Sequence, residues 1–229
     1  MRTVQWQMPK KDNAIDLNIY FTVKHSIELD PSFTVLVFTS PSNVEAFLEK
    51  NKILPHQKVI AMGDAGGSVD EVAATIVAGL DAGQRLVFVT LGDPNVYSTF
   101  STVAARVRAL RPDAVIETVA GIMAFQELAA RSGTVVLQHT ERLALVTALD
   151  GPEVLDAALD DPTQAVVVYK GGRHLPAMAK SLAAAGRLDG AVVGELLGLP
   201  GERVVPVGEA GDGPAAYLAT LIVPPVGRQ

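Results

Sequence analysis

The segment VFVTLGDPNVYSTF, residues 87–100, decides the fold of this chain. Residues 87–91 form a mostly apolar run, which is typical of a strand buried on both faces of a parallel sheet. The Gly-Asp-Pro sequence at 92–94 then predicts a turn, and a helix is expected to begin near Tyr97. Ligands lie outside the carboxyl ends of the strands in open parallel sheets. The turn is therefore the first candidate for a binding site.

The same unit of a strand followed by a helix recurs on both sides of this segment. Alternation of units of this kind is typical of a parallel, doubly wound sheet with right-handed crossovers. The apolar spacing predicts strands at 15–23, 35–40, 58–62, 85–91 and 115–119. One helix is expected after a cap at Ser42 or Asn43, and a second is expected to begin at Ser68 or Asp70 and to run through Leu80. Two more helices are expected at 97–110 and 123–131.

The pattern changes after residue 133. Strands are expected near 143–148, 165–169, 191–197 and 217–223, with a helix at 177–185. Two strands in this part arrive without an intervening helix, which predicts some antiparallel pairing. We therefore expect an α/β protein. Its N-terminal domain, residues 1–132, has the parallel doubly wound sheet, its smaller C-terminal domain, residues 133–229, has a mixed sheet, and residues 131–140 form the hinge.

Composition excludes several functional classes. With 229 residues and 48% hydrophobic content, the chain can bury a sizeable core. A net charge of −6, without a long run of Lys or Arg, argues against nucleic-acid and acidic-membrane partners. The chain has no Cys, and its four His lack metal-ligand spacing, so no metal site is expected. Without a signal core or a run of about 20 apolar residues, a cytoplasmic protein is expected.

Two segments together resemble the tetrapyrrole methylases of cobalamin biosynthesis. They are GDPNVYSTF at 92–100 and ETVAGIMAFQELAA at 117–130. The family has G-D-P-x-x-Y-[SG]-[ST] in the first place and E-x-[VI]-P-G-[IV]-[ST]-[SA]-F in the second. Within the family, YKGGRHLP at 169–176 and AGRLDGAVVGELLGLPGERV at 185–204 are most similar to the precorrin-2 carbon-20 methyltransferases. The resemblance runs from about Gly66 to the C-terminus.

This resemblance implies that S-adenosylmethionine, or its demethylated product S-adenosylhomocysteine, binds the chain. Methyl transfer from a sulfonium requires chiefly alignment and a desolvated pocket, so Asp93 is assigned to binding and no catalytic residue is assigned. On its spacing alone, a strand followed by Gly-Asp-Pro is equally well only a turn. The residues implied for the cofactor are Gly92, Asp93, Tyr97, Ser98, Thr99, Gly121, Ile122, Met123, Leu145 and Tyr169.

A small basic cluster follows the strand expected at 165–169. It contains Lys170, Arg173 and His174. Charge-assisted hydrogen bonds from these side chains suit the carboxylates of a tetrapyrrole, so they are the candidate substrate site. A solvated loop is an equal alternative. The family resemblance also implies a homodimer.

The chain departs from the family in three places. Ala120 stands where proline is usual, and Met123 stands where Ser or Thr is common. Residues 1–64 lack the family's first loop, G-x-G-P-G-D-x-x-L-[LT]-T. Residues 15–65 instead resemble one lobe of uroporphyrinogen III synthase, through VLVFTSPSNV at 35–44 and KVIAMG at 58–63. Thr39, Ser40 and Ser42 match the ligand-facing turn of that lobe.

Three hypotheses follow. The first is a chimera joined near Gly63, in which a methylase body over residues 65–229 keeps its cofactor segments but turns over poorly without the glycine-rich loop. The second is an engineered, folded chimera without catalytic function. The third is a tetrapyrrole binder of the synthase type.

Overall fold

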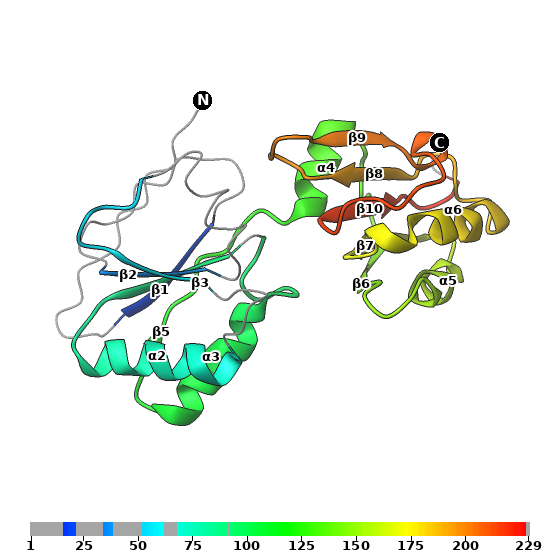
Figure 1. Ribbon diagram of the computed structural model, residues 1–229. Coiled ribbons are helices and arrows are strands. Elements are labelled where there is room, and N and C mark those ends of the chain that lie inside the picture. Colours follow the sequence, from blue (N-terminus) through cyan, green and yellow to red (C-terminus); the bar gives the residue numbers. More distant parts are fainter. Residues whose placement is uncertain (1–15, 22–33, 39–51, 62–67, 91, 228–229) are drawn as a thin grey trace. The chain divides into compact units, whose positions relative to one another are not determined.

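The computed structural model (Figure 1) describes residues 16–21, 34–38, 52–61, 68–90 and 92–227. The chain divides into two compact units, Met1–Ile122 and Met123–Gln229. We predicted the boundary after residue 132, at the end of helix α4 (Ala124–Ser132). That position is wrong because Phe125 and Leu128 of α4 pack with Ile222 in the core of the second unit.

The first unit is built on a parallel sheet with the strand order β3-β2-β4-β1-β5. All four neighbouring pairs in this sheet are parallel, which confirms the predicted fold class. The helix expected after Ser42 lies outside the described residues, as do Thr39 and Ser40. The strands are β1 (Asp16–Phe21), β2 (Val35–Phe38), β3 (Lys58–Ala61), β4 (Leu86–Thr90) and β5 (Val115–Ile116).

Helices α2 (Val69–Asp81) and α3 (Thr99–Leu110) cover one face of this sheet (Figure 1). Ser68 caps α2 in a capping box with Glu71, and the apolar stripe of the helix, including Ile76, is buried on the sheet. Phe100 of α3 meets Phe88 of β4 edge to face, with ring centroids 5.2 Å apart. This contact fixes the start of α3 close to β4.

The second unit has a mixed sheet with the order β6-β7-β10-β8-β9. β6 and β7 are parallel, whereas β10 is antiparallel to β7 and β8, and β9 is antiparallel to β8. The predicted mixed sheet is confirmed. The strands are β6 (Arg142–Thr147), β7 (Gln164–Tyr169), β8 (Val192–Glu195), β9 (Arg203–Pro206) and β10 (Ala219–Val223).

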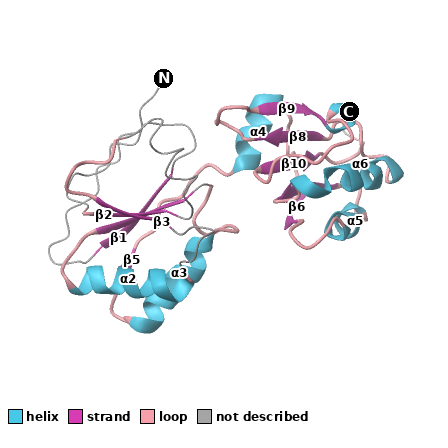
Figure 2. Ribbon diagram, viewed as in Figure 1, coloured by secondary structure: helices cyan, strands magenta, loops and turns pink. Residues whose placement is uncertain are grey.

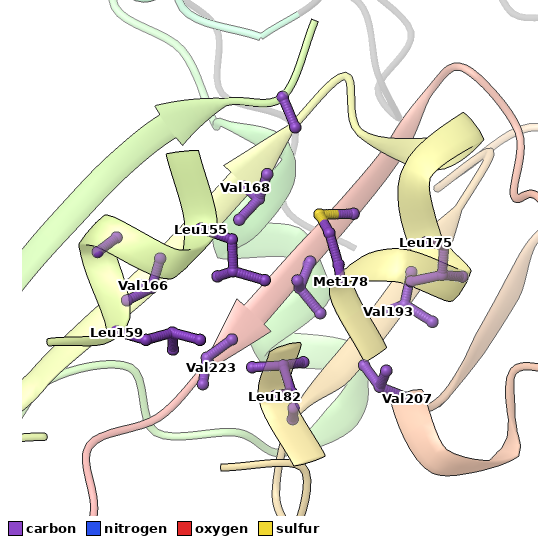
Figure 3. Close-up of a cluster of buried hydrophobic side chains, with 14 of the residues drawn as sticks. Leu155, Leu159, Val166, Val168, Leu175, Met178, Leu182, Val193, Val207 and Val223 are labelled. Carbon is purple, nitrogen blue, oxygen red and sulfur yellow. The ribbon is translucent and has the colours of Figure 1, made fainter. Parts of the chain in front are cut away.

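Helices cover both faces of the second sheet (Figure 2). On one face, α5 (Glu153–Leu159) and α6 (Leu175–Ala184) pack on Val166 and Val168 (Figure 3). On the other face, α4 packs on Val167, because successive side chains of a strand point to opposite faces. Two 3₁₀ turns, η1 (Gly172–His174) and η2 (Val207–Glu209), complete the unit. Across the described ranges, no helix has the length and apolar character needed to cross a membrane.

Candidate functional site

The Gly-Asp-Pro turn leaves the central strand of the first sheet. β4 stands third of the five strands, and its residues are buried. Gly92 has a φ of +75°, a left-handed conformation that favours glycine. Among the residues that the structure describes, no atom lies within 4 Å of a Cβ placed on Gly92, so these residues leave the backbone here open. A ligand can approach this part of the turn closely.

Ser98 closes the turn at the start of α3. Its Oγ accepts a hydrogen bond from the Phe100 backbone N–H, with an N···O distance of 3.2 Å. The same Oγ lies 3.1 Å from Oγ1 of Thr90, a residue that is only 3% exposed. The Ser98 hydroxyl thus works as a helix cap and holds the turn to the end of β4. Thr99, the next candidate, is exposed and carries its own hydroxyl.

Asp93 connects this turn to residues 117–130, the second segment that resembles the family. Its Oδ1 accepts from the Asn95 backbone N–H at 2.9 Å, and its Oδ2 accepts from the Gly121 backbone N–H at 3.0 Å. Both carboxylate oxygens therefore hold backbone groups of the chain itself. The structure thus brings two of the cofactor candidates, Asp93 and Gly121, into contact.

Two exposed apolar side chains flank these loops. Tyr97 is 48% exposed and Ile122 is 51% exposed. Tyr97 also has a φ of +49°, a left-handed conformation that is unusual for a bulky residue. With the open face of Gly92 and the hydroxyl of Thr99, the first unit presents backbone, hydroxyl and apolar groups along two loops.

The cofactor candidates of the second unit gather around the start of α4. Met123 and Leu145 pack against the hydrophobic cluster that contains Phe125 and Leu128. The Tyr169 hydroxyl accepts a hydrogen bond from the Phe125 backbone N–H, with an N···O distance of 3.2 Å. Burial raises the pKa of Tyr169 to about 12. Tyr169 therefore links the end of β7 to the first turn of α4.

The basic cluster follows β7 directly. Lys170 has a φ of +58°, and Arg173 and His174 lie on η1. The Arg173 guanidinium donates to the Leu149 carbonyl and, at 2.9 Å, to Nε2 of His174. A guanidinium carries five N–H donors, and these two hydrogen bonds use only two of them. Arg173 is exposed, which leaves it accessible to an anionic group.

Thr90 is a residue of the site that the sequence pattern does not identify. The pattern assigns it only to a buried strand, whereas its Oγ1 lies 3.1 Å from Oγ of Ser98. The signal was available, because Thr90 is a polar residue near the end of an apolar strand that enters the turn. Within the part of the chain that the structure describes, no group of three or more His, Asp or Glu side chains is placed to hold a metal ion.

Comparison with known sequences gives one family. The family model of the tetrapyrrole (corrin/porphyrin) methylases matches residues 34–211. This match begins inside the stretch that resembles the synthase lobe. A precorrin-2 C(20)-methyltransferase from a Sinorhizobium species is 30% identical over 152 residues, which are 66% of this chain and 60% of that relative. The chain thus spans about 60% of the length of that relative.

Solved structures of methyltransferases share the fold. A cobalt precorrin-4 methyltransferase matches 92% of this chain and 95% of its own, with a TM-score of 0.71 and 17% identity. A uroporphyrin-III C-methyltransferase from Thermus thermophilus, solved in complex with S-adenosylhomocysteine, matches 91% of this chain and 96% of its own, with a TM-score of 0.62 and 19% identity. At these identities the matches establish the fold.

Proposed function

Since the chain belongs to the tetrapyrrole methylase family, we propose that it binds S-adenosylmethionine and transfers its methyl group to a tetrapyrrole of cobalamin biosynthesis. The observation that carries this proposal is the Asp93–Gly121 hydrogen bond, which joins the two segments on which the family resemblance rests. Both segments follow strands of one parallel sheet, where ligands bind in folds of this kind.

The residues of the first unit suit the chemistry of this cofactor. The open backbone at Gly92 and the exposed hydroxyl of Thr99 offer hydrogen-bonding groups for its ribose and amino-acid parts. The exposed side chains of Tyr97 and Ile122 offer apolar surface for its adenine. Bound S-adenosylmethionine supplies a methyl group on a positively charged sulfur. The chain's own task is to hold that methyl group in line and to exclude water.

The proposed substrate is precorrin-2, with methylation at carbon 20. Support comes from the segments 169–176 and 185–204 and from the Sinorhizobium relative of that name. In the second unit, Lys170, Arg173 and His174 suit the carboxylates of such a substrate, because charge-assisted hydrogen bonds are the stronger ones. The roles of Met123, Leu145 and Tyr169 in cofactor binding stay predictions, as does a homodimer.

We propose further that turnover is slow although cofactor binding is retained. No glycine precedes Gly63 in the sequence, so no glycine-rich loop follows β1 (Asp16–Phe21) as it does in the family. A glycine lets the backbone approach a ligand closely because it has no Cβ. Other residues keep the backbone farther from the ligand. Chemistry that depends on alignment is sensitive to such a change, since misplacement by about 1 Å can reduce a rate about 100-fold.

The test is methyl transfer by the purified chain. Labelled S-adenosylmethionine is incubated with precorrin-2 and stoichiometric protein, and the tetrapyrrole is analysed for one added methyl group. We expect slow but protein-dependent methylation, absent with heat-denatured chain. If no label reaches precorrin-2 after prolonged incubation, the proposed activity is wrong. Turnover as fast as that of the Sinorhizobium relative would contradict the proposed effect of the missing loop.

The origin of residues 1–64 stays a prediction. The similarity of 35–44 and 58–63 to a uroporphyrinogen III synthase lobe supports a chimera joined near Gly63, whether engineered or natural. The family model overlaps this head from residue 34 onward. A synthase-type tetrapyrrole binder predicts spectral changes with uroporphyrinogen that depend on Thr39 and Ser40. A chimera without ligand function predicts no binding of either ligand.

A further inference from the structure

The Asp93 carboxylate joins two loops that are distant in the sequence. Asp93 and Gly121 lie 28 positions apart, and the Oδ2 to backbone N distance is 3.0 Å. Residues 117–123 form neither helix nor strand, so no ladder of backbone hydrogen bonds fixes this loop. Its position therefore depends on contacts such as the bond to Asp93.

The place of this bond in the sheet gives it a particular importance. β1 lies between β4 and β5, and all three strands are parallel. The turn at 92–94 follows β4, and the loop at 117–123 follows β5. The Asp93–Gly121 bond thus joins loops on the two sides of β1 at the carboxyl ends of the strands.

Hydrogen bonds within its own turn hold Asp93 in place. Its other oxygen, Oδ1, accepts from the Asn95 backbone N–H at 2.9 Å. The Asp93 backbone carbonyl accepts from the Val96 N–H at 3.2 Å, and Ser98 ties the end of the turn to Thr90. Contacts within the turn therefore fix the Asp93 carboxylate independently of its bond to Gly121.

We propose that Asp93 is a positioning residue, which sets the spacing of the two cofactor loops through the Gly121 amide and leaves cofactor contact to other groups. The inference rests on the proposed function, because it requires that both loops bind the cofactor. A carboxylate suits this task, since each oxygen accepts a charge-assisted hydrogen bond from one of the two backbone N–H groups.

Asp93→Asn tests this role with almost no change of shape. An amide has one acceptor oxygen, so its NH₂ group must face either the Asn95 or the Gly121 N–H, and two donors repel each other. We expect the Kd for S-adenosylhomocysteine, measured by calorimetric titration, to rise about tenfold. Hydrogen exchange of the Gly121 amide should be faster in the variant. Asp113→Asn, at an exposed aspartate of the same unit, is the matched control and should change neither.

A rescue variant separates positioning from direct contact. Proline at position 120 restricts the backbone next to Gly121, which lowers the entropy lost when the loop is ordered. Ala120→Pro in the Asp93→Asn background should therefore recover part of the lost affinity. Asp93→Glu, which keeps the charge but moves both oxygens, should weaken binding even if the Asn variant does not fold.

The outcomes distinguish this inference from the proposed function. If the wild-type chain does not bind S-adenosylhomocysteine, both fail. If the wild type binds and Asp93→Asn binds equally well, only the positioning role fails. If Asp93→Asn weakens binding while exchange at Gly121 is unchanged, Asp93 contacts the cofactor directly and the positioning role is overturned.

Discussion

At Gly92, the absence of a side chain serves two purposes that substitution can separate. The left-handed φ of +75° disfavours any residue with a Cβ, and the open space beside it lets a ligand approach. Gly83 also has a left-handed φ, of +71°, and equally open surroundings among the described residues. It lies in the turn after α2, away from the candidate site.

Gly92→Ala and Gly83→Ala should therefore destabilise the fold by similar amounts. The left-handed conformation costs a non-glycine residue about 1 kcal/mol, and no clash adds to this cost. Urea unfolding measures the free energies. Only Gly92→Ala should also weaken S-adenosylhomocysteine binding, as measured by titration. Equal affinities of the two variants would show that Gly92 does not border the cofactor.

The sequence predicts part of this site at the level of single residues. A glycine in a turn and a serine before a helix have local signatures, so the roles of Gly92 and Ser98 in ending β4 and starting α3 are predictable. The partner of Asp93 is not predictable in this way. It is a backbone N–H, which every residue except proline carries, and it lies 28 positions away.

Among the elements of the second unit, β7 and α4 are linked by the hydroxyl of Tyr169. It accepts from the Phe125 N–H, and burial raises the pKa of Tyr169 to about 12 from its ordinary 10.0. Between these pH values the folded chain keeps a proton that the unfolded chain loses. The contribution of Tyr169 to the free energy of unfolding is therefore complete below about pH 10, and it is lost as the pH rises through about 12.

Tyr169→Phe removes this pH dependence. Urea unfolding at a series of pH values from below 10 to about 12 should show a steeper loss of stability in the wild type than in the variant. Tyr217→Phe, at a tyrosine that is 63% exposed, is the control and should keep the wild-type slope. Parallel slopes for wild type and Tyr169→Phe would contradict the burial of this hydroxyl.

Elements with a clear apolar pattern are predictable from this sequence, including short strands such as β2 and β8. The helices expected at 70–80, 97–110 and 123–131 agree with α2, α3 and α4 within a few residues. α5 is not predicted because its seven residues span only about two helical turns, too few to show a clear period. β9 is not predicted because its sequence, RVVP, has neither an alternating pattern nor a long apolar run. The assignment of α4 to the first unit failed because packing, and not the chain's own pattern, decides which sheet a helix covers.

For the whole molecule, fold and family membership rest on independent observations. The family model covers residues 34–211, and solved methyltransferases match more than nine-tenths of the chain. The chain contains the two segments that carry the family resemblance, at 92–100 and 117–130, and the basic cluster, whereas no glycine precedes Gly63. We therefore expect cofactor binding to be retained and turnover to be slow.

Calorimetric titration of the purified chain with S-adenosylhomocysteine tests this account most directly, because it measures binding without requiring turnover. We predict saturable binding of about one ligand per chain, weakened by Asp93→Asn and not by Asp113→Asn. Absence of any binding heat at high micromolar concentration, from protein that circular dichroism shows to be folded, would contradict the account.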